Sequence, residues 1–193
     1  MSARYDIRPL TPALWADFET VLGGSGQSGC WCMYWLLGSA EFRAGSAGGG
    51  AASNRAAFRA RVTDGPPPGL LAYDGATPVA WVRVLPRAAL PALANSRFFK
   101  TDLPTDGIWS LSCFVVRAKW RRRGLTEVLT RAAIDHARAH GATALEAYPT
   151  DTAERRPSSA VYLGLASTFR RLGFHEVQRL APHKPMLRLA LDA

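Results

Sequence analysis

A cluster of basic side chains stands directly before a glycine and a helix near the middle of the chain. Arg117, Lys119 and the all-arginine run 121–123 precede Gly124. The first turn of a helix leaves four backbone N–H groups unpaired and carries a partial positive charge, so it can hold a diphosphate. Glycine lets that backbone approach the anion without an intervening Cβ. A solvated basic turn would have the same composition, but the flanking elements favour a phosphate site.

Two regular elements must position this turn. Residues 108–116 are rich in β-branched and aromatic side chains and have no helical spacing, which predicts a mostly buried strand. After Gly124, apolar residues recur at steps of three and four, which predicts a helix with one buried face. Gly141 is expected to end that helix, because glycine readily takes the positive φ found just past a helix end.

The turn and a second motif are similar to those of one known family. Arg121-Arg122-Arg123-Gly124-Leu125-Thr126 resembles the Arg/Gln-x-x-Gly-x-Gly/Ala turn of the GCN5-related N-acetyltransferase (GNAT) superfamily, although Thr126 stands where Gly or Ala is usual. Residues 169–174 (FRRLGF) are similar to the closing Tyr-x-x-x-Gly-Phe turn of that family. With residues 7–11, the resemblance spans most of the chain, and it is weakest between about 23 and 54.

The resemblance implies an α/β fold with a mixed, mainly antiparallel sheet of six to seven strands. About four helices would flank this sheet, which is splayed at its central strand, in one domain over residues 1–193. The resemblance also implies acetyl-CoA as co-substrate and direct attack by a primary amine, without a metal. The implied cofactor-binding residues are Phe114, Val115 and Val116 on the strand, one of whose amides would meet the thioester oxygen, and Arg121, Arg122, Arg123, Gly124, Leu125 and Thr126 in the turn.

The groups that many relatives use to move protons are missing from the matching positions. Phe169 stands where a tyrosine would give a proton to the leaving thiolate, and Ser110 stands near the place of a basic glutamate. Tyr162 and Glu146 are the substitutes we consider, against the alternatives of a half-buried structural tyrosine and a solvated carboxylate. Proton loss through a water chain also stays open. A non-catalytic acyl-CoA sensor is the rival function that these absences suggest.

An aromatic and cysteine-rich patch, residues 29–38 (GCWCMYWLLG), lies in the variable region 23–54 that would border the acceptor site. Core packing and the lining of an acceptor pocket are both compatible with it. Zinc is disfavoured, because Cys30 and Cys32 are too close together and have no further ligand pair nearby. Cys113, on the central strand, is expected to be an inert buried thiol.

The remaining pattern predicts the elements that surround this centre. Residues 39–52, rich in Gly, Ala and Ser, are expected to form a mobile loop, and 86–105 an irregular stretch. Strands are predicted at about 5–10, 70–73, 78–85, 143–148, 174–180 and 184–189, and helices at about 12–22, from 53 or 54 to 62, and 165–172.

The amino-acid composition limits the classes of molecule that the protein is expected to bind. The chain has 193 residues, 48% of them hydrophobic, and 24 Lys plus Arg against 15 Asp plus Glu give a net charge of +9. This charge attracts anions, but no aromatic stripe accompanies the basic cluster, so nucleic acid is not the expected partner. A small-molecule amine or a protein lysine or N-terminus is the expected acceptor, and a homodimer is compatible with the chain. No signal peptide or long apolar run is visible, which predicts a cytoplasmic protein without a membrane partner.

Overall fold

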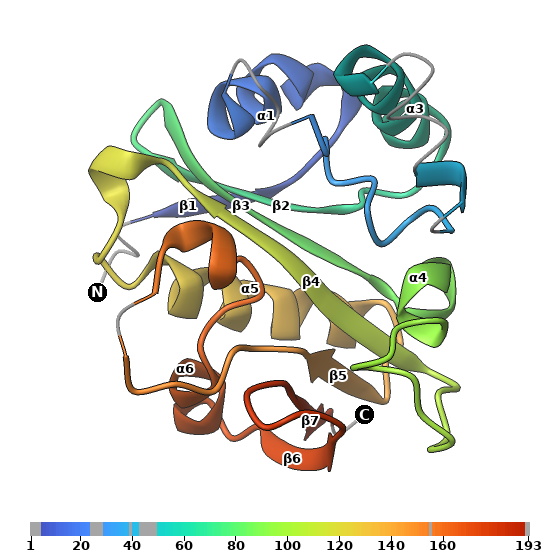
Figure 1. Cartoon of the computed structure of the whole chain (residues 1–193). Coiled ribbons are helices and arrows are strands. Elements are labelled where there is room, and N and C mark those ends of the chain that lie inside the picture. Colours follow the sequence, from blue (N-terminus) through green and yellow to red (C-terminus); the bar gives the residue numbers. More distant parts are fainter. Residues whose placement is uncertain (1–4, 24–28, 39, 43–49, 155, 192–193) are drawn as a thin grey trace.

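The computed structural model describes residues 5–23, 29–38, 40–42, 50–154 and 156–191. Its centre is a seven-stranded sheet in the order β1-β2-β3-β4-β5-β7-β6. Helices cover both faces of this sheet, with α1 and α3 on one side and α5 and α6 on the other (Figure 1). The strands are β1 (Asp6–Pro9), β2 (Gly69–Asp74), β3 (Thr77–Pro86), β4 (Ile108–Val116), β5 (Ala144–Ala147), β6 (His175–Arg179) and β7 (Pro185–Ala190). The helices are α1 (Trp15–Leu22), α3 (Gly50–Asp64), α4 (Pro91–Ala94), α5 (Leu125–Ala139) and α6 (Ala166–Arg171).

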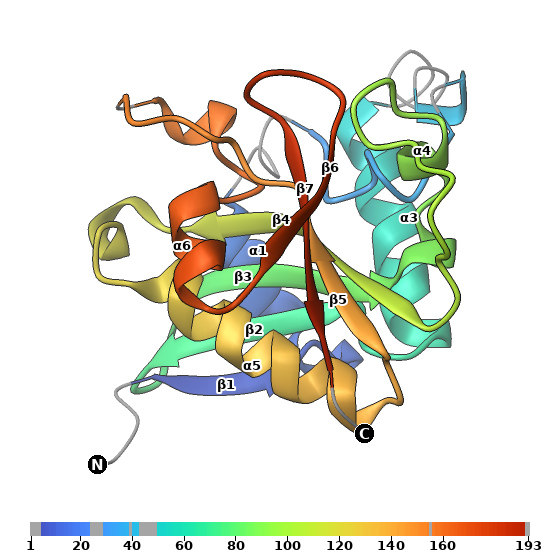
Figure 2. The ribbon, with the colours of Figure 1, turned by 90° about the horizontal axis from the view of Figure 1, so that it is seen from below.

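Only one pair of neighbouring strands, β4 and β5, is parallel, and the other five pairs are antiparallel. A parallel pair needs a crossover connection, and α5 supplies it by running back along one face of the sheet (Figure 2). The predicted mixed, mainly antiparallel sheet is therefore confirmed.

The sheet opens at its central strand. Arg83 of β3 pairs with Cys113 and Val84 pairs with Leu111, so Ser112 is an extra residue on β4. Such a bulge bends its strand and disrupts the local ladder. On the other side of β4, pairing with β5 ends at Leu111 and Ala147. Residues 112–116 therefore have β3 on one side and no β5 partner on the other, which is the expected splay.

Two hydrophobic clusters hold the layers together. Under α1 and α3, Phe18 and Phe58 pack against Trp81 of β3, and all three side chains are fully buried. On the opposite face, Leu129 and Ala133 of α5 are fully buried in the second cluster. Leu129 and Ala133 are four residues apart, and this helical spacing of apolar residues is what predicts α5 from the sequence.

Several predicted boundaries differ from the structure. The predicted helix 12–22 is a 3-10 turn (Pro12–Leu14) followed by α1, and the irregular stretch 86–105 contains a 3-10 turn (Arg87–Ala89) and α4. Most of the predicted mobile loop 39–52 lies outside the described residues. The helix predicted from 53 or 54 begins earlier, as α3. Asn54 therefore lies inside α3, and its buried side-chain amide donates to the Gly29 carbonyl at 2.9 Å.

None of the helices within the described ranges is long and apolar enough to cross a membrane.

Candidate active site

The basic turn enters α5 through backbone conformations that turn N–H groups outward. Arg122 has φ +62° and Gly124 has φ +76°, both in the left-handed region. Alternation of left-handed residues in a turn gathers successive N–H groups into an anion-binding concavity. The first helical bonds to the Gly124 carbonyl are donated by Glu127 and Val128, at 2.9 and 3.1 Å. The amides of Leu125 and Thr126 therefore precede the helical ladder and face the end of the helix.

Basic side chains on the same turn anchor it to the sheet. Arg121 donates through Nε to the Val116 carbonyl at 3.1 Å. Arg117 donates to the Pro78 carbonyl at 2.9 Å and lies over the Trp120 ring. Arg121 is thus a support for the backbone cradle as well as a source of positive charge beside it.

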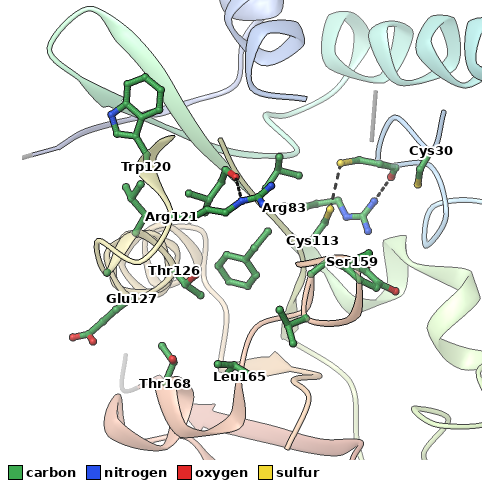
Figure 3. A pocket seen from close by; sticks show the side chains of 18 of the residues that line it. Cys30, Arg83, Cys113, Trp120, Arg121, Thr126, Glu127, Ser159, Leu165 and Thr168 are labelled. Atoms are coloured by element: carbon green, nitrogen blue, oxygen red, sulfur yellow. Dashed lines mark hydrogen bonds between the residues drawn. The ribbon is translucent and has the colours of Figure 1, made fainter. Parts of the chain in front are cut away.

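One pocket joins this turn to the open edge of β4 and to the cysteine-rich patch. Its volume is about 630 Å³, within the range of small-molecule sites. Figure 3 places Arg121 and Thr126 at one end of the pocket and Cys30, Arg83 and Cys113 at the other. Eight of the nine residues predicted to bind the cofactor line it: Phe114, Val115, Val116, Arg121, Arg122, Gly124, Leu125 and Thr126. The ninth, Arg123, is exposed outside the pocket wall.

The β4 amides alternate in direction, and this decides which of them face the opening. The Arg117 amide donates to the Val79 carbonyl on the β3 side, so the amide of Val115 points that way too. The amides of Phe114 and Val116 point to the open side. The Phe114 amide donates to the Tyr162 carbonyl at 2.7 Å. The segment before α6 therefore occupies one of the two open-edge amides.

Tyr162 lines the pocket and is half-buried. Burial raises the pKa of its hydroxyl, and the neighbouring Cys113 thiol acts in the same direction. The phenol therefore stays protonated and neutral at physiological pH. A protonated phenol can donate a proton, but it cannot act as a general base.

Glu146 does not line the pocket. Its side chain is fully buried and paired with Arg87 and Arg188, each at 2.5 Å. The Tyr148 hydroxyl donates to the same carboxylate at 2.7 Å and lies 2.7 Å from the Ser110 hydroxyl. The solvated carboxylate that we considered as the alternative is wrong, because β7 and the turn after β3 bring two arginines to this point. The position of Glu146 also gives no support to its predicted role in proton transfer.

Four residues at the far end of the pocket were not predicted as site residues. Cys30, Cys32, Arg83 and Cys113 all line it. The inert buried thiol expected at position 113 is instead a half-buried pocket residue, with its Sγ 3.6 Å from that of Cys32. Arg83 is fully buried. A single arginine inside the apolar run VAWVRVL was the signal that could have marked this position.

The aromatic patch both packs the core and lines the pocket. Trp31 and Trp35 are each 5% exposed and belong to the core cluster under α1 and α3. Tyr34 is 47% exposed and, with Trp35, lines the pocket. Core packing and pocket lining are therefore both present in this segment: Trp31 packs in the core, Tyr34 lines the pocket, and Trp35 does both.

Several solved structures have the same fold. An N-acetyltransferase from Staphylococcus aureus matches with TM-score 0.56 at 13% identity, over 98% of this chain and 100% of that one. A GCN5-related N-acetyltransferase from Kribbella flavida matches with TM-score 0.52 at 13% identity, over 97% and 98%. The PaiA N-acetyltransferase from Thermoplasma acidophilum, in complex with coenzyme A, matches with TM-score 0.52 at 10% identity, over 97% and 99%. At such identities the likeness establishes the fold alone.

In sequence, no curated protein matches this chain. The acetyltransferase (GNAT) family, however, matches residues 33–165, which include β4, the basic turn, α5 and the segment of Tyr162. This match covers more than half of the chain and agrees with the splayed sheet and the cradle at Gly124. The chain belongs to the GNAT family and is an acetyltransferase.

Proposed function

We propose that the protein transfers the acetyl group of acetyl-CoA to a primary amine by direct attack. The observation that carries this proposal is the continuous pocket from the helix N-terminus at Gly124 to the open edge of β4. This pocket connects the proposed phosphate site with the open edge of β4, where backbone N–H groups would donate to the thioester carbonyl oxygen.

The residues present fit acetyl-CoA. Left-handed Arg122 and Gly124 form a concavity for a diphosphate, and the amides of Leu125 and Thr126 would donate to it. The open-edge amide of Val116 would hold the amide-containing arm of the cofactor. When bound, acetyl-CoA supplies the acetyl group as an activated thioester.

The Phe114 amide is the best-placed donor for a thioester oxygen, since it faces the open edge beside the cysteine-rich end. It is bonded to the Tyr162 carbonyl at 2.7 Å. We propose that this bond is exchanged when the site fills, so that the amide becomes an oxyanion donor without any charged side chain. The segment around Tyr162 would therefore move on binding.

Tyr162 is the proposed proton donor to the leaving thiolate. Its hydroxyl is protonated at neutral pH, for the reasons given above, and its side chain lines the pocket. The acceptor would enter from the end lined by Tyr34 and Trp35. Because this end is aromatic and partly enclosed, a small-molecule amine is favoured over a protein lysine or N-terminus.

A non-catalytic acyl-CoA sensor is the second candidate. Phe169 and Ser110 replace the usual proton-handling residues, and the Phe114 amide is already occupied. Thiol release from acetyl-CoA in the presence of a panel of small amines, with mass detection of the acetylated product, separates the two. The enzyme releases thiol and forms an amide. Binding of coenzyme A without release by any amine or peptide would favour the sensor.

The role of Tyr162 is tested by Tyr162→Phe, which keeps the ring and removes the proton. We expect kcat to fall by about 10²-fold with little change in KM, because a donor that acts only in the transition state contributes to kcat. An unchanged kcat would show that Tyr162 is not the proton donor and has only a structural role.

A further inference from the structure

Two cysteines from distant parts of the chain meet in the wall of the pocket. Cys32 comes from the segment between α1 and α3, and Cys113 comes from β4. The Cys32 thiol donates to the Cys113 sulfur at 3.6 Å. Figure 3 shows Cys113 in this contact, with Cys30 nearby but outside it. The acetyl transfer proposed above does not use these thiols.

A buried cation lies beside this pair. Arg83 is fully buried and forms no ion pair with any carboxylate of the described residues. It donates to the Ser112 hydroxyl at 2.9 Å, to the Ser112 carbonyl at 3.3 Å and to the Cys32 carbonyl. These partners are neutral, so no negative charge of the described residues compensates this cation, in a setting where an unpaired charge is costly. A thiolate on the neighbouring cysteine would compensate it.

The two thiols differ in the way that an attacking and a resolving cysteine must differ. The hydrogen bond from Cys32 lowers the pKa of Cys113, and the charge of Arg83 adds to this effect against the opposing effect of burial. The pKa of Cys32 is raised by the same hydrogen bond and by burial. Cys113 is half-buried and lines the pocket, whereas Cys32 is 4% exposed. Oxidant-sensitive cysteines are accessible, have thiolate character and stand next to a resolving cysteine.

We propose that Cys113 and Cys32 form a site that reacts with hydroperoxides and closes to a disulfide. The Cys113 thiolate attacks a peroxide oxygen and the O–O bond breaks. The departing hydroxide takes up the proton that the Cys113 thiol released, so that a sulfenic acid and one water are formed. The Cys32 sulfur then attacks the Cys113 sulfur, the S–O bond breaks, and hydroxide leaves with the Cys32 proton as a second water. Two thiols are thereby oxidised by two electrons and one hydrogen peroxide is reduced to two waters.

A disulfide between Cys32 and Cys113 would act on a segment whose backbone has an unusual conformation. Trp31 and Cys32 both have positive φ, at +46° and +59°, which is costly for residues with side chains. The disulfide would tie this left-handed pair to β4, one residue before Phe114. Oxidation would therefore restrain the pocket wall next to the proposed oxyanion donor, and a dithiol reductant would release it.

The test uses the full-length reduced protein and equimolar hydrogen peroxide, followed by alkylation with N-ethylmaleimide and intact-mass measurement. The chain has three cysteines, so we expect alkylation to fall from three thiols to one and to recover with dithiothreitol. Peptide mapping without reductant should find a cross-link between the peptides that contain positions 32 and 113.

Cys30→Ser is the matched control, because Cys30 lies in the same pocket but outside the sulfur–sulfur contact. It should form the disulfide at an unchanged rate and lose both remaining thiols. Cys32→Ser should form no disulfide and should accumulate a sulfenic acid at Cys113 that dimedone traps. Cys113→Ser should lower the rate of peroxide-dependent thiol loss by at least about tenfold. A cross-link that involves Cys30, or no disulfide in the folded wild-type protein, would overturn the proposal.

A pH profile of alkylation gives a readout that does not depend on peroxide. The groups that face Cys113 are Cys30 and Cys32 from the segment before α3, Arg83 from β3, and Tyr162 from the segment before α6. Burial raises the pKa of Cys30. Cys113 should therefore be alkylated at a lower pH than Cys30 in the same molecule, and the reverse order would contradict the assignment.

Discussion

At the scale of single residues, the proposed phosphate site depends on backbone conformation more than on the number of arginines. Gly124 has φ +76°, and a Cβ built on it would meet nothing within 4 Å. Space is therefore available for a side chain, and the conformation alone selects glycine. Arg121 has its Nε on the Val116 carbonyl, and Arg123 lies outside the pocket. We therefore propose that the outward N–H groups of the turn are the main ligands for the diphosphate, with the charge of Arg122 in the pocket wall beside them.

Substitution at Gly124 separates conformation from charge. Gly124→Ala should raise the Kd for coenzyme A by about tenfold, because a left-handed alanine costs about 1–2 kcal/mol. Gly124→Glu adds bulk and a negative charge beside the phosphates, and should raise the Kd by more than about 10²-fold. Isothermal titration calorimetry measures both, and circular dichroism checks that the fold is kept. Wild-type affinity in Gly124→Glu would refute the cradle.

At the scale of elements, a buried network of charged side chains stabilises the parallel pairing of β4 and β5. Glu146 is opposite Arg188 in the β5–β7 register and also pairs with Arg87. Through Tyr148, the same carboxylate is linked to Ser110 on β4. The network lies where β4 and β5 still pair, just before they separate. It thus holds the closed end of the split whose open end forms the pocket.

Glu146→Gln tests this structural role. Loss of the carboxylate leaves Arg87 buried without a negative partner, and we expect the free energy of unfolding to fall by about 3–5 kcal/mol. Asp135→Asn is the control, because it removes an exposed ion pair with Arg138 and should change stability by less than about 1 kcal/mol. Urea unfolding measures both variants. Unchanged stability with a large loss of kcat would instead return Glu146 to the catalytic role.

At the scale of the whole molecule, the pocket lies where two parts of the sheet diverge. Strands β1 to β4 form one part, β5, β7 and β6 form the other, and α5 crosses between them. Elements of both parts line the pocket, since β4 and the turn before α5 face the segment that precedes α6 (Figure 3). A ligand in the pocket would therefore add contacts across the split.

Coenzyme A should raise the thermal stability of the protein, because a ligand that binds only the folded state stabilises that state. At a free concentration of about 100 times Kd, one-site binding stabilises the folded state by about 2.7 kcal/mol. For a chain of this length, that free energy corresponds to a rise in Tm of about 5–10 °C. Differential scanning calorimetry measures the shift, and Gly124→Glu should show less than about 2 °C at the same concentration, because its weaker binding leaves at most about 0.4 kcal/mol of stabilisation. The absence of a shift in the wild-type protein would contradict coenzyme A binding to the folded protein.

The sequence by itself determined the parts whose information is local. The strand, basic turn and helix that surround Gly124 lie within residues 108–141, so hydrophobic spacing, turn chemistry and the unpaired helix-end amides could all be read from neighbouring residues. The mixed, mainly antiparallel sheet and its splay at β4 followed from the resemblance, and both agree with the structure.

Only the tertiary structure decided which side chains from distant parts of the sequence contact each other. Cys32 and Cys113 are 81 residues apart, and Glu146 is 59 residues from Arg87. The bond between the Phe114 amide and the Tyr162 carbonyl likewise joins separate elements. No local pattern encodes such contacts, because burial and charge pairing depend on which elements the fold places together. A carboxylate expected in solvent is therefore an internal ion pair, and a thiol expected to be inert lines the pocket.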